Sequence, residues 1–133
     1  MKTNYNEFTI SAKFDNNKAA IWDSTNFNHN VVTVKNNDNG KRVTFDFWGS
    51  RVEPEIKTEN DLLYSFYCFL NDAILGTYCF DSFCRDLGLD TDSRKAEKSW
   101  RSCKRSWTKF FNLTGYSADM LFDIYEQIRE IVD

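Results

Sequence analysis

The spacing of the apolar residues changes once along the chain, near residue 54, and this change constrains the fold more than any other feature. Before it, apolar and polar residues alternate with a period of two, as in half-buried strands. After it, apolar residues recur every three or four positions, as in amphipathic helices. Pro54, the only proline, lies at this boundary and is incompatible with a helix interior. We therefore expect a β half over residues 1–50 and a helical half over residues 58–133.

Three or four strands are expected in the N-terminal half. Residues 8–14 and 18–23 are separated by an Asp-Asn-Asn turn, and residues 31–35 and 41–48 flank the loop 36–40. This loop is rich in Asn and ends in Gly, and both residues tolerate the positive φ of a tight hairpin loop. In the strands at 8–14 and 41–48, alternation places these apolar side chains on one face: Phe8, Ile10, Ala12 and Phe14, and Val43, Phe45 and Phe47.

About four helices are expected in the C-terminal half. Thr58, followed by Asp61, resembles a capping box, and Gly76 is expected to end the first helix. A short helix over 78–87 should stop at Gly88, a long one should run from the cap candidates at 90–93 to about 111, and Ser117 should begin the last. The first helix is apolar on most sides and should lie on the sheet. The prediction is an α+β fold, a small antiparallel sheet packed against a layer of helices.

Size and composition narrow the classes of protein further. A chain of 133 residues matches one domain, 1–133. The first residues contain no apolar signal region, and no window approaches the roughly 18 apolar residues of a membrane span, so we expect a cytoplasmic protein that does not enter membranes. A net charge of −3 is too small for a nucleic-acid mimic and creates no general attraction to DNA.

The charge is distributed unevenly, and the third expected helix is strongly basic. Residues 94–109 contain seven Lys or Arg and one Glu, a sum of +6 within a chain of net charge −3. At 100° per residue, four of these basic residues fall within an arc of roughly 60°: Arg94, Lys98, Arg101 and Arg105. The apolar residues of the same helix lie opposite: Ala96, Trp100, Cys103, Trp107 and Phe110.

Two interpretations of this basic face remain open. It is either an ordinary solvated face, neutralised by acids such as Glu126, Glu130 and Asp133, or a contact surface for phosphates or an acidic protein. The planar guanidinium group favours the second, because it suits bidentate contacts with phosphate or carboxylate. The candidate partner-binding residues are therefore Arg94, Lys98, Arg101, Arg105 and Lys109, with Trp48 either an aromatic anchor for the partner or a residue that closes the end of the sheet.

No catalytic, metal or cofactor site is expected. The four cysteines, Cys68, Cys79, Cys84 and Cys103, fall in helical segments. Structural zinc sites usually use short pairs such as C-x₂₋₄-C, and here the only close pair is Cys79 and Cys84, with four residues between them. Asp46 followed by Glu55-Ile56-Lys57 is similar to the D…ExK pattern of metal-dependent nucleases, but a proline precedes the triplet and a helix cap follows it. His29 lies among asparagines, without a nucleophile motif nearby. We expect a protein that is not an enzyme.

Two stretches resemble a known group of sequences. They are FDFWGS at 45–50, running into PEIKT at 54–58, and Phe80 to Ala96, which reads FxxFCxxxGxDxDSRKA. Both are similar to small uncharacterised proteins encoded in bacterial prophages and mobile elements, over roughly residues 43–107. This resemblance carries no functional residues with it. It implies a phage setting, in which small proteins without catalytic groups often inhibit host defence, anti-CRISPR proteins among them.

The functional hypothesis is a non-enzymatic, phage-encoded inhibitor of a host defence nuclease. It would act in the bacterial cytoplasm by binding the effector protein, such as a CRISPR nuclease, or its guide-RNA complex. The alternative is a small RNA- or DNA-binding regulatory protein, whose binding of free nucleic acid would fade steeply with salt. An Mg²⁺-dependent nuclease that loses activity on Asp46→Ala is a third possibility.

Overall fold

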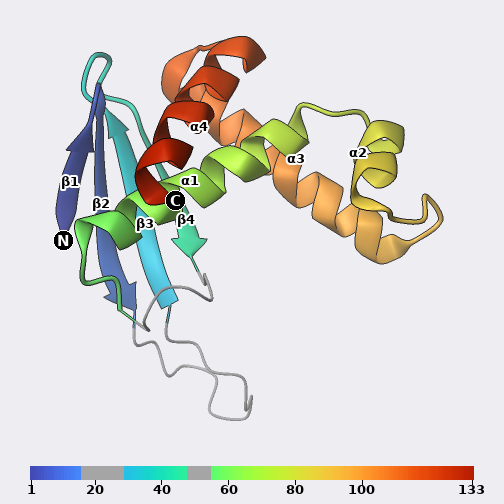
Figure 1. The fold of residues 1–133 in the computed structure, drawn as a ribbon, viewed down its shortest axis with the longest axis horizontal. Coiled ribbons are helices and arrows are strands. Elements are labelled where there is room, and N and C mark those ends of the chain that lie inside the picture. Colours follow the sequence, from blue (N-terminus) through green and yellow to red (C-terminus); the bar gives the residue numbers. More distant parts are fainter. Residues whose placement is uncertain (16–28, 48–54) are drawn as a thin grey trace. The chain divides into compact units, whose positions relative to one another are not determined.

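The computed structural model describes residues 1–15, 29–47 and 55–133. Four strands precede four helices, so the predicted α+β class is confirmed (Figure 1). The elements are β1 (Lys2–Tyr5), β2 (Phe8–Asp15), β3 (His29–Asn36), β4 (Arg42–Phe47), α1 (Glu59–Gly76), α2 (Phe80–Leu87), α3 (Arg94–Thr114) and α4 (Ala118–Val132). They form two compact units, one of Met1–Phe66 with Val132 and one of Tyr67–Ile131 with Asp133.

The sheet is antiparallel throughout, in the order β1-β2-β3-β4. Its first strand was not predicted from the sequence, because β1 has four residues and only a faint alternation. It pairs with β2 through a two-residue turn at Asn6 and Glu7, in which Asn6 adopts a φ of 51°. Asn is among the residues that enter this left-handed region most readily, which makes a tight hairpin possible here.

Two predictions about the N-terminal half lie outside the described residues. These are the strand at 18–23 and the whole of Trp48. The hairpin of β3 and β4 is confirmed, because the strands pair from Asn30 with Phe47 to Lys35 with Arg42. Its loop contains Gly40 at a φ of 75°.

The core of the first unit lies between the sheet and the first half of α1. Phe8 and Phe66 meet edge to face with ring centroids 5.3 Å apart, and Phe47 and Tyr64 do so at 6.0 Å. The predicted alternation is confirmed, because Phe8, Ile10, Val32 and Val34 are fully buried on this face. The central placement of α1 therefore holds for its first half, where large aromatic side chains fill the space above the strands.

Two hydrogen bonds fix the connector that leads into α1, and the sequence predicted only the second of them. The backbone N–H of Ile56 donates to the buried Asn30 side chain at 3.0 Å, which attaches the connector to β3. Thr58 then caps the helix, because its hydroxyl accepts a hydrogen bond from the Asp61 N–H at 3.0 Å. The predicted cap at Thr58 is confirmed, and it satisfies one of the N–H groups that every helix start leaves open.

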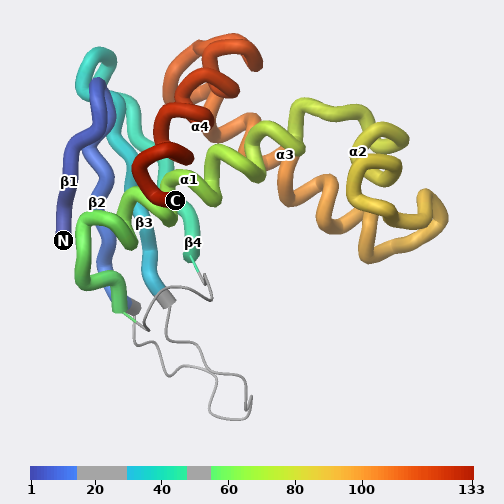
Figure 2. The backbone as a smooth tube through the Cα atoms, in the orientation of Figure 1, coloured from blue at the N-terminus to red at the C-terminus, as the bar shows by residue number. Residues whose placement is uncertain are grey.

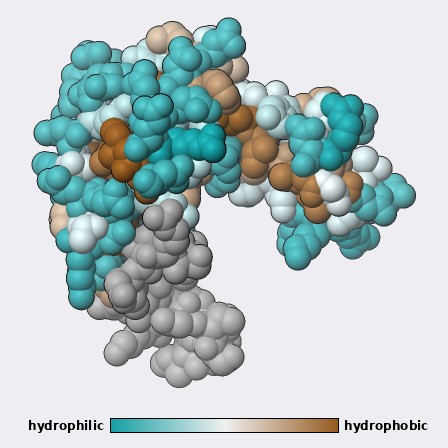
Figure 3. Space-filling model, in the orientation of Figure 1, coloured by the Kyte–Doolittle hydropathy of each residue, from teal (hydrophilic) through white to brown (hydrophobic). Residues whose placement is uncertain are grey.

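In the second unit, α2 folds back beside the first half of α3 (Figure 2). The buried residues between them are Phe83, Cys84, Ala96 and Cys103. The indole N–H of Trp100 donates to the Tyr78 carbonyl at 3.0 Å, just before α2 begins. The same region shows hydrophobic residues grouped between α2 and α3, with hydrophilic residues around them (Figure 3).

The predicted helix end at Gly76 is confirmed, but the reason for a glycine there is different from the one predicted. It is the last residue of α1 and is not among the described residues with positive φ, so it does not end the helix by a left-handed turn. Instead, the backbones of α1 and α3 meet there. A Cβ on Gly76 would lie 2.6 Å from the carbonyl carbon of Cys103 and 2.9 Å from the nitrogen of Lys104. Glycine is needed because only it allows so close an approach.

The other helix boundaries agree well with the sequence signals. Gly88 ends α2 at a φ of 66°. The hydroxyls of Ser93 and Ser117 cap α3 and α4 by accepting hydrogen bonds from Ala96 N–H at 3.2 Å and Met120 N–H at 3.3 Å. The third helix continues to Thr114, three residues past the predicted end, because its left-handed cap is Gly115.

Candidate functional site

The candidate site is the cationic stripe of α3, defined here as Arg94, Lys98, Arg101, Arg105 and Lys109. All five side chains belong to exposed residues. They follow the helix at intervals of three and four residues, so a stripe from the first to the last spans about 22 Å at 1.5 Å per residue. The predicted exposure of this face is confirmed.

The opposite face of α3 fixes the orientation of the stripe. Ala96, Cys103 and Phe110 are buried, and Trp100 and Trp107 are half-buried. Trp100 packs its ring against Phe80 with centroids 5.3 Å apart. These contacts prevent α3 from rotating about its axis, because rotation would bring the tryptophans into water and the charged groups into an apolar core.

The ion pairs of the stripe are few. Arg101 contacts Glu97, one turn earlier on the same helix, at 2.7 Å and with a second hydrogen bond through Nε at 3.1 Å. The side chains of Arg101 and Glu97 are 64% and 49% exposed, so this pair contributes only about a few tenths of a kcal/mol. Within residues 1–15, 29–47 and 55–133, Arg94, Lys98 and Arg105 form no ion pair.

The acids expected to neutralise the stripe do not form ion pairs with it where the structure describes the chain. Arg129 of α4 contacts Glu126 at 3.9 Å and Asp133 at 3.5 Å. Glu130 makes no ion pair with the stripe in the described part of the chain. The interpretation in which α4 neutralises the stripe is therefore wrong for these three acids, and the positive charge of α3 faces solvent.

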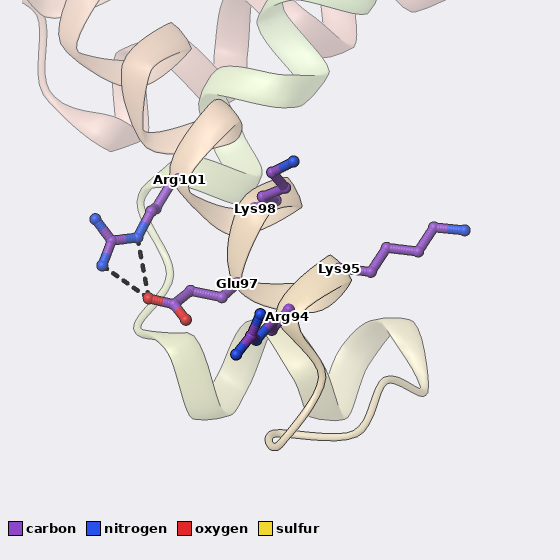
Figure 4. A pocket seen from close by; sticks show the side chains of 5 residues that line it. All are labelled: Arg94, Lys95, Glu97, Lys98 and Arg101. Atoms are coloured by element: carbon purple, nitrogen blue, oxygen red, sulfur yellow. Dashed lines mark hydrogen bonds and ion pairs between the residues drawn. The ribbon is translucent and has the colours of Figure 1, made fainter.

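A hollow of about 640 Å³ adjoins the first half of the stripe. The described residues that line it are Arg94, Lys95, Glu97, Lys98 and Arg101. In Figure 4, Arg101 and Glu97 lie together on one side of α3, while Lys95 and Lys98 extend on the other. Lys95 and Glu97 were not among the predicted site residues, because their angles place them beside the stripe, although their charge is visible in the sequence.

Not every cation of α3 is equally available. The ammonium of Lys104 lies 4.6 Å from the centroid of the Trp100 ring, a cation–π contact. Lys109 is exposed but takes part in an interaction of its own. Trp48, the predicted aromatic anchor for the partner, lies outside the described residues. The geometry therefore brings together Arg94, Lys98, Arg101 and Arg105 as one surface.

The residues considered for chemistry are dispersed. Asp46 is an exposed residue of β4, whereas Glu55 and Lys57 lie in the connector before α1 and on no strand. His29 begins β3, and its side chain is outside the described part. Among the described residues, no group of three or more His, Cys, Asp or Glu is arranged to hold a metal ion.

The cysteines differ sharply in environment. Cys103 is buried, which raises the pKa of its thiol to about 11, with Asp72 adding to the effect. Cys79 is exposed, and hydrogen bonds from Ser82 lower the pKa of its thiol. All four cysteines are free thiols. Cys103 therefore packs as a small apolar residue, whereas the thiol of Cys79 is accessible at the surface.

Two negative findings complete the description. Within the described ranges, no helix combines the length and apolar character that crossing a membrane requires. No protein-family model, curated protein or solved structure matches the chain.

Proposed function

We propose that this protein is a non-enzymatic binding protein that docks on a host defence nuclease through the cationic stripe of α3. The ligand chemistry is anionic, either the carboxylates of an acidic protein surface or the phosphates of the guide RNA that such a nuclease carries. The phage setting depends on the resemblance of residues 43–107 to prophage proteins. The docking surface depends on the geometry of α3.

One observation carries the proposal: Arg94, Lys98 and Arg105 project from the exposed face of α3 without an ion-pair partner in the described part of the chain. A single solvated cation is common on any protein surface, but these three side chains lie in a row with a fixed spacing along α3. Arginine is enriched among the residues that dominate binding energy at interfaces. Its fork also forms paired hydrogen bonds with carboxylate or phosphate.

The Glu97 pair of Arg101 does not oppose binding. An exposed pair separated by one helical turn contributes little, so a partner anion can replace Glu97 at small cost. Until then, Glu97 holds the guanidinium in a defined position beside the hollow. A group that is already ordered loses less conformational entropy when it binds.

The test compares two charge reversals with equal changes in net charge. Arg101→Glu with Arg105→Glu changes the stripe, and Lys57→Glu with Arg85→Glu changes exposed positions outside it. We expect the stripe variant to bind the nuclease at least tenfold more weakly and the control to bind as the native protein does. Circular dichroism checks that both variants fold.

The partner is isolated from a bacterial host lysate with the tagged protein, with and without ribonuclease, and identified by mass spectrometry. The purified nuclease is then assayed for target cleavage. A complex that survives ribonuclease supports an acidic protein surface, and one that is lost supports guide RNA. Full inhibition by the stripe variant would refute the assignment of the surface. Cleavage that native protein leaves unchanged would refute the inhibitor function.

A further inference from the structure

Part of the outer face of the sheet, opposite the apolar core, is polar and cationic, while the next row on that face contains Lys13, Val31 and Asp46. The strand register aligns its side chains in two neighbouring rows across the four strands: Lys2, Ser11, Thr33 and Thr44, and then Asn4, Thr9, Lys35 and Arg42. The described residues of this face include no aromatic side chain. All of them belong to the first compact unit, whereas α3 belongs to the second.

A shallow hollow of about 190 Å³ lies where the two rows meet. Three cations line it, together with hydroxyl groups from the two central strands: Lys2, Lys35 and Arg42, with Thr9, Ser11 and Thr33. No carboxylate contributes to the lining among the described residues. In the same part of the chain, Lys2, Lys35 and Arg42 form no ion pair.

Two like charges face each other in this hollow. Lys35 of β3 and Arg42 of β4 are direct partners in the register. Such pairs place Cβ atoms about 5 Å apart, and like charges at this distance destabilise the sheet. Among the described residues, no carboxylate lines the hollow to offset the repulsion, so an external anion between the two side chains would relieve it.

Hydrogen bonds order the polar side chains around the cations. The Asn37 amide donates to Thr9 Oγ1 at 2.9 Å, and the Thr9 hydroxyl donates to Asn4 Oδ1 at 2.8 Å. The hydroxyls of Thr33 and Thr44 lie 3.3 Å apart. These groups both donate and accept, so they suit a ligand that offers hydroxyls as well as negative charge.

We propose that this face binds the backbone of double-stranded RNA. Phosphates would lie among Lys2, Lys35 and Arg42, and ribose 2′-hydroxyls would meet the threonine and serine hydroxyls. Single-stranded RNA is usually held by stacking its bases on aromatic rings, and the described residues of this face include none. A duplex hides its bases, and its wide, shallow minor groove displays 2′-hydroxyls to a flat surface.

The proposal is independent of the docking function of α3 and is tested separately. Binding of the full chain to a fluorescent 20-base-pair RNA duplex is measured by anisotropy over a range of salt. The same sequence as a DNA duplex and as single-stranded RNA serves for comparison. We compare Lys35→Gln with Arg42→Gln against a matched control, Lys57→Gln with Arg85→Gln, in which one Lys and one Arg are also neutralised.

We expect the RNA duplex to bind more tightly than the other two nucleic acids. The sheet variant should bind it roughly tenfold more weakly, and the slope of log affinity against log salt should fall by about 1 for each phosphate contact removed. The control should lose much less. Equal binding of DNA, tighter binding of single-stranded RNA, no binding at all, or equal losses in variant and control would each overturn the proposal.

A further variant separates binding from folding. Arg42→Glu places opposite charges across from each other in the register, so the free protein should melt at a higher temperature. The same change should abolish RNA binding, because it puts a carboxylate among the phosphates. A variant that is more stable and still binds the duplex would contradict the assignment of this hollow.

Discussion

Replacing Gly76 with alanine tests the closest helix contact of the second unit. If Gly76 were an ordinary helical residue, alanine would stabilise α1 by up to about 1 kcal/mol, because glycine is a poor helix former. The structure predicts the opposite sign. The new Cβ would lie 2.6 Å from the Cys103 carbonyl carbon, about 0.8 Å short of the 3.4 Å at which ordinary contacts begin.

The magnitude follows from which atoms must move. The obstruction is the backbone of α3, not the end of a flexible side chain, so the two helices must separate. Overpacking of this kind costs about 1–3 kcal/mol, which exceeds the gain in helix propensity. We therefore expect Gly76→Ala to lower the free energy of unfolding by about 1–2 kcal/mol.

Urea denaturation followed by circular dichroism measures this difference, and tryptophan fluorescence adds a probe that includes Trp100 beside the contact. Asn60→Ala is the control, since Asn60 is an exposed position on the same helix where alanine gains propensity without a new contact. The control should be slightly stabilising. A Gly76→Ala protein that is as stable as the native one, or more stable, would refute the close approach of the two helices.

Two further predictions concern α3 and the thiols. Ser93→Ala removes the hydroxyl that accepts a hydrogen bond from the Ala96 N–H, so it should lower the free energy of unfolding by about 1 kcal/mol in urea denaturation. Ser93→Asn should restore the stability of the native protein. A Ser93→Ala protein as stable as the native one would contradict the role of Ser93 as a cap. Iodoacetamide at pH 7.5 should modify Cys79 first and Cys103 only on unfolding. The reagent reacts with thiolates, and the pKa of Cys103 is raised to about 11 whereas that of Cys79 is lowered. Early modification of Cys103, detected by peptide mapping with mass spectrometry, would contradict its burial.

Much of the candidate site was predictable because a helix has a fixed period. Once α3 was identified, 100° per residue separated Arg94 and Arg101 from Trp100 and Cys103 without knowledge of any neighbour. The helix cap at Ser117 was predictable for the same reason, and the cap of α3 was narrowed to the candidates at 90–93, of which the structure selects Ser93, since a cap acts within three residues of itself.

Contacts between distant residues were not predictable in this way. The sequence could not show whether Glu126 and Asp133 would neutralise the stripe, because an ion pair depends on where two helices lie. It placed the end of α1 correctly at Gly76 but could not show that this residue meets the backbone of Cys103, because Cys103 is 27 positions away in the chain and leaves no local signal. The strand β1 was missed because four residues carry too little alternation to recognise.

Sequence alone thus determined the class of fold, the placement of strands before helices and the charged face of α3, because backbone geometry sets these properties over a few neighbouring residues. The folded structure decided which side chains from separate elements meet: Lys35 opposite Arg42 on the sheet, and Gly76 against Cys103 in the second unit. The approach of two helices results from packing across long stretches of chain, which a local pattern does not encode. The register of the hairpin depends on the exact length of its turn, and a shift by one residue would exchange the two faces of a strand.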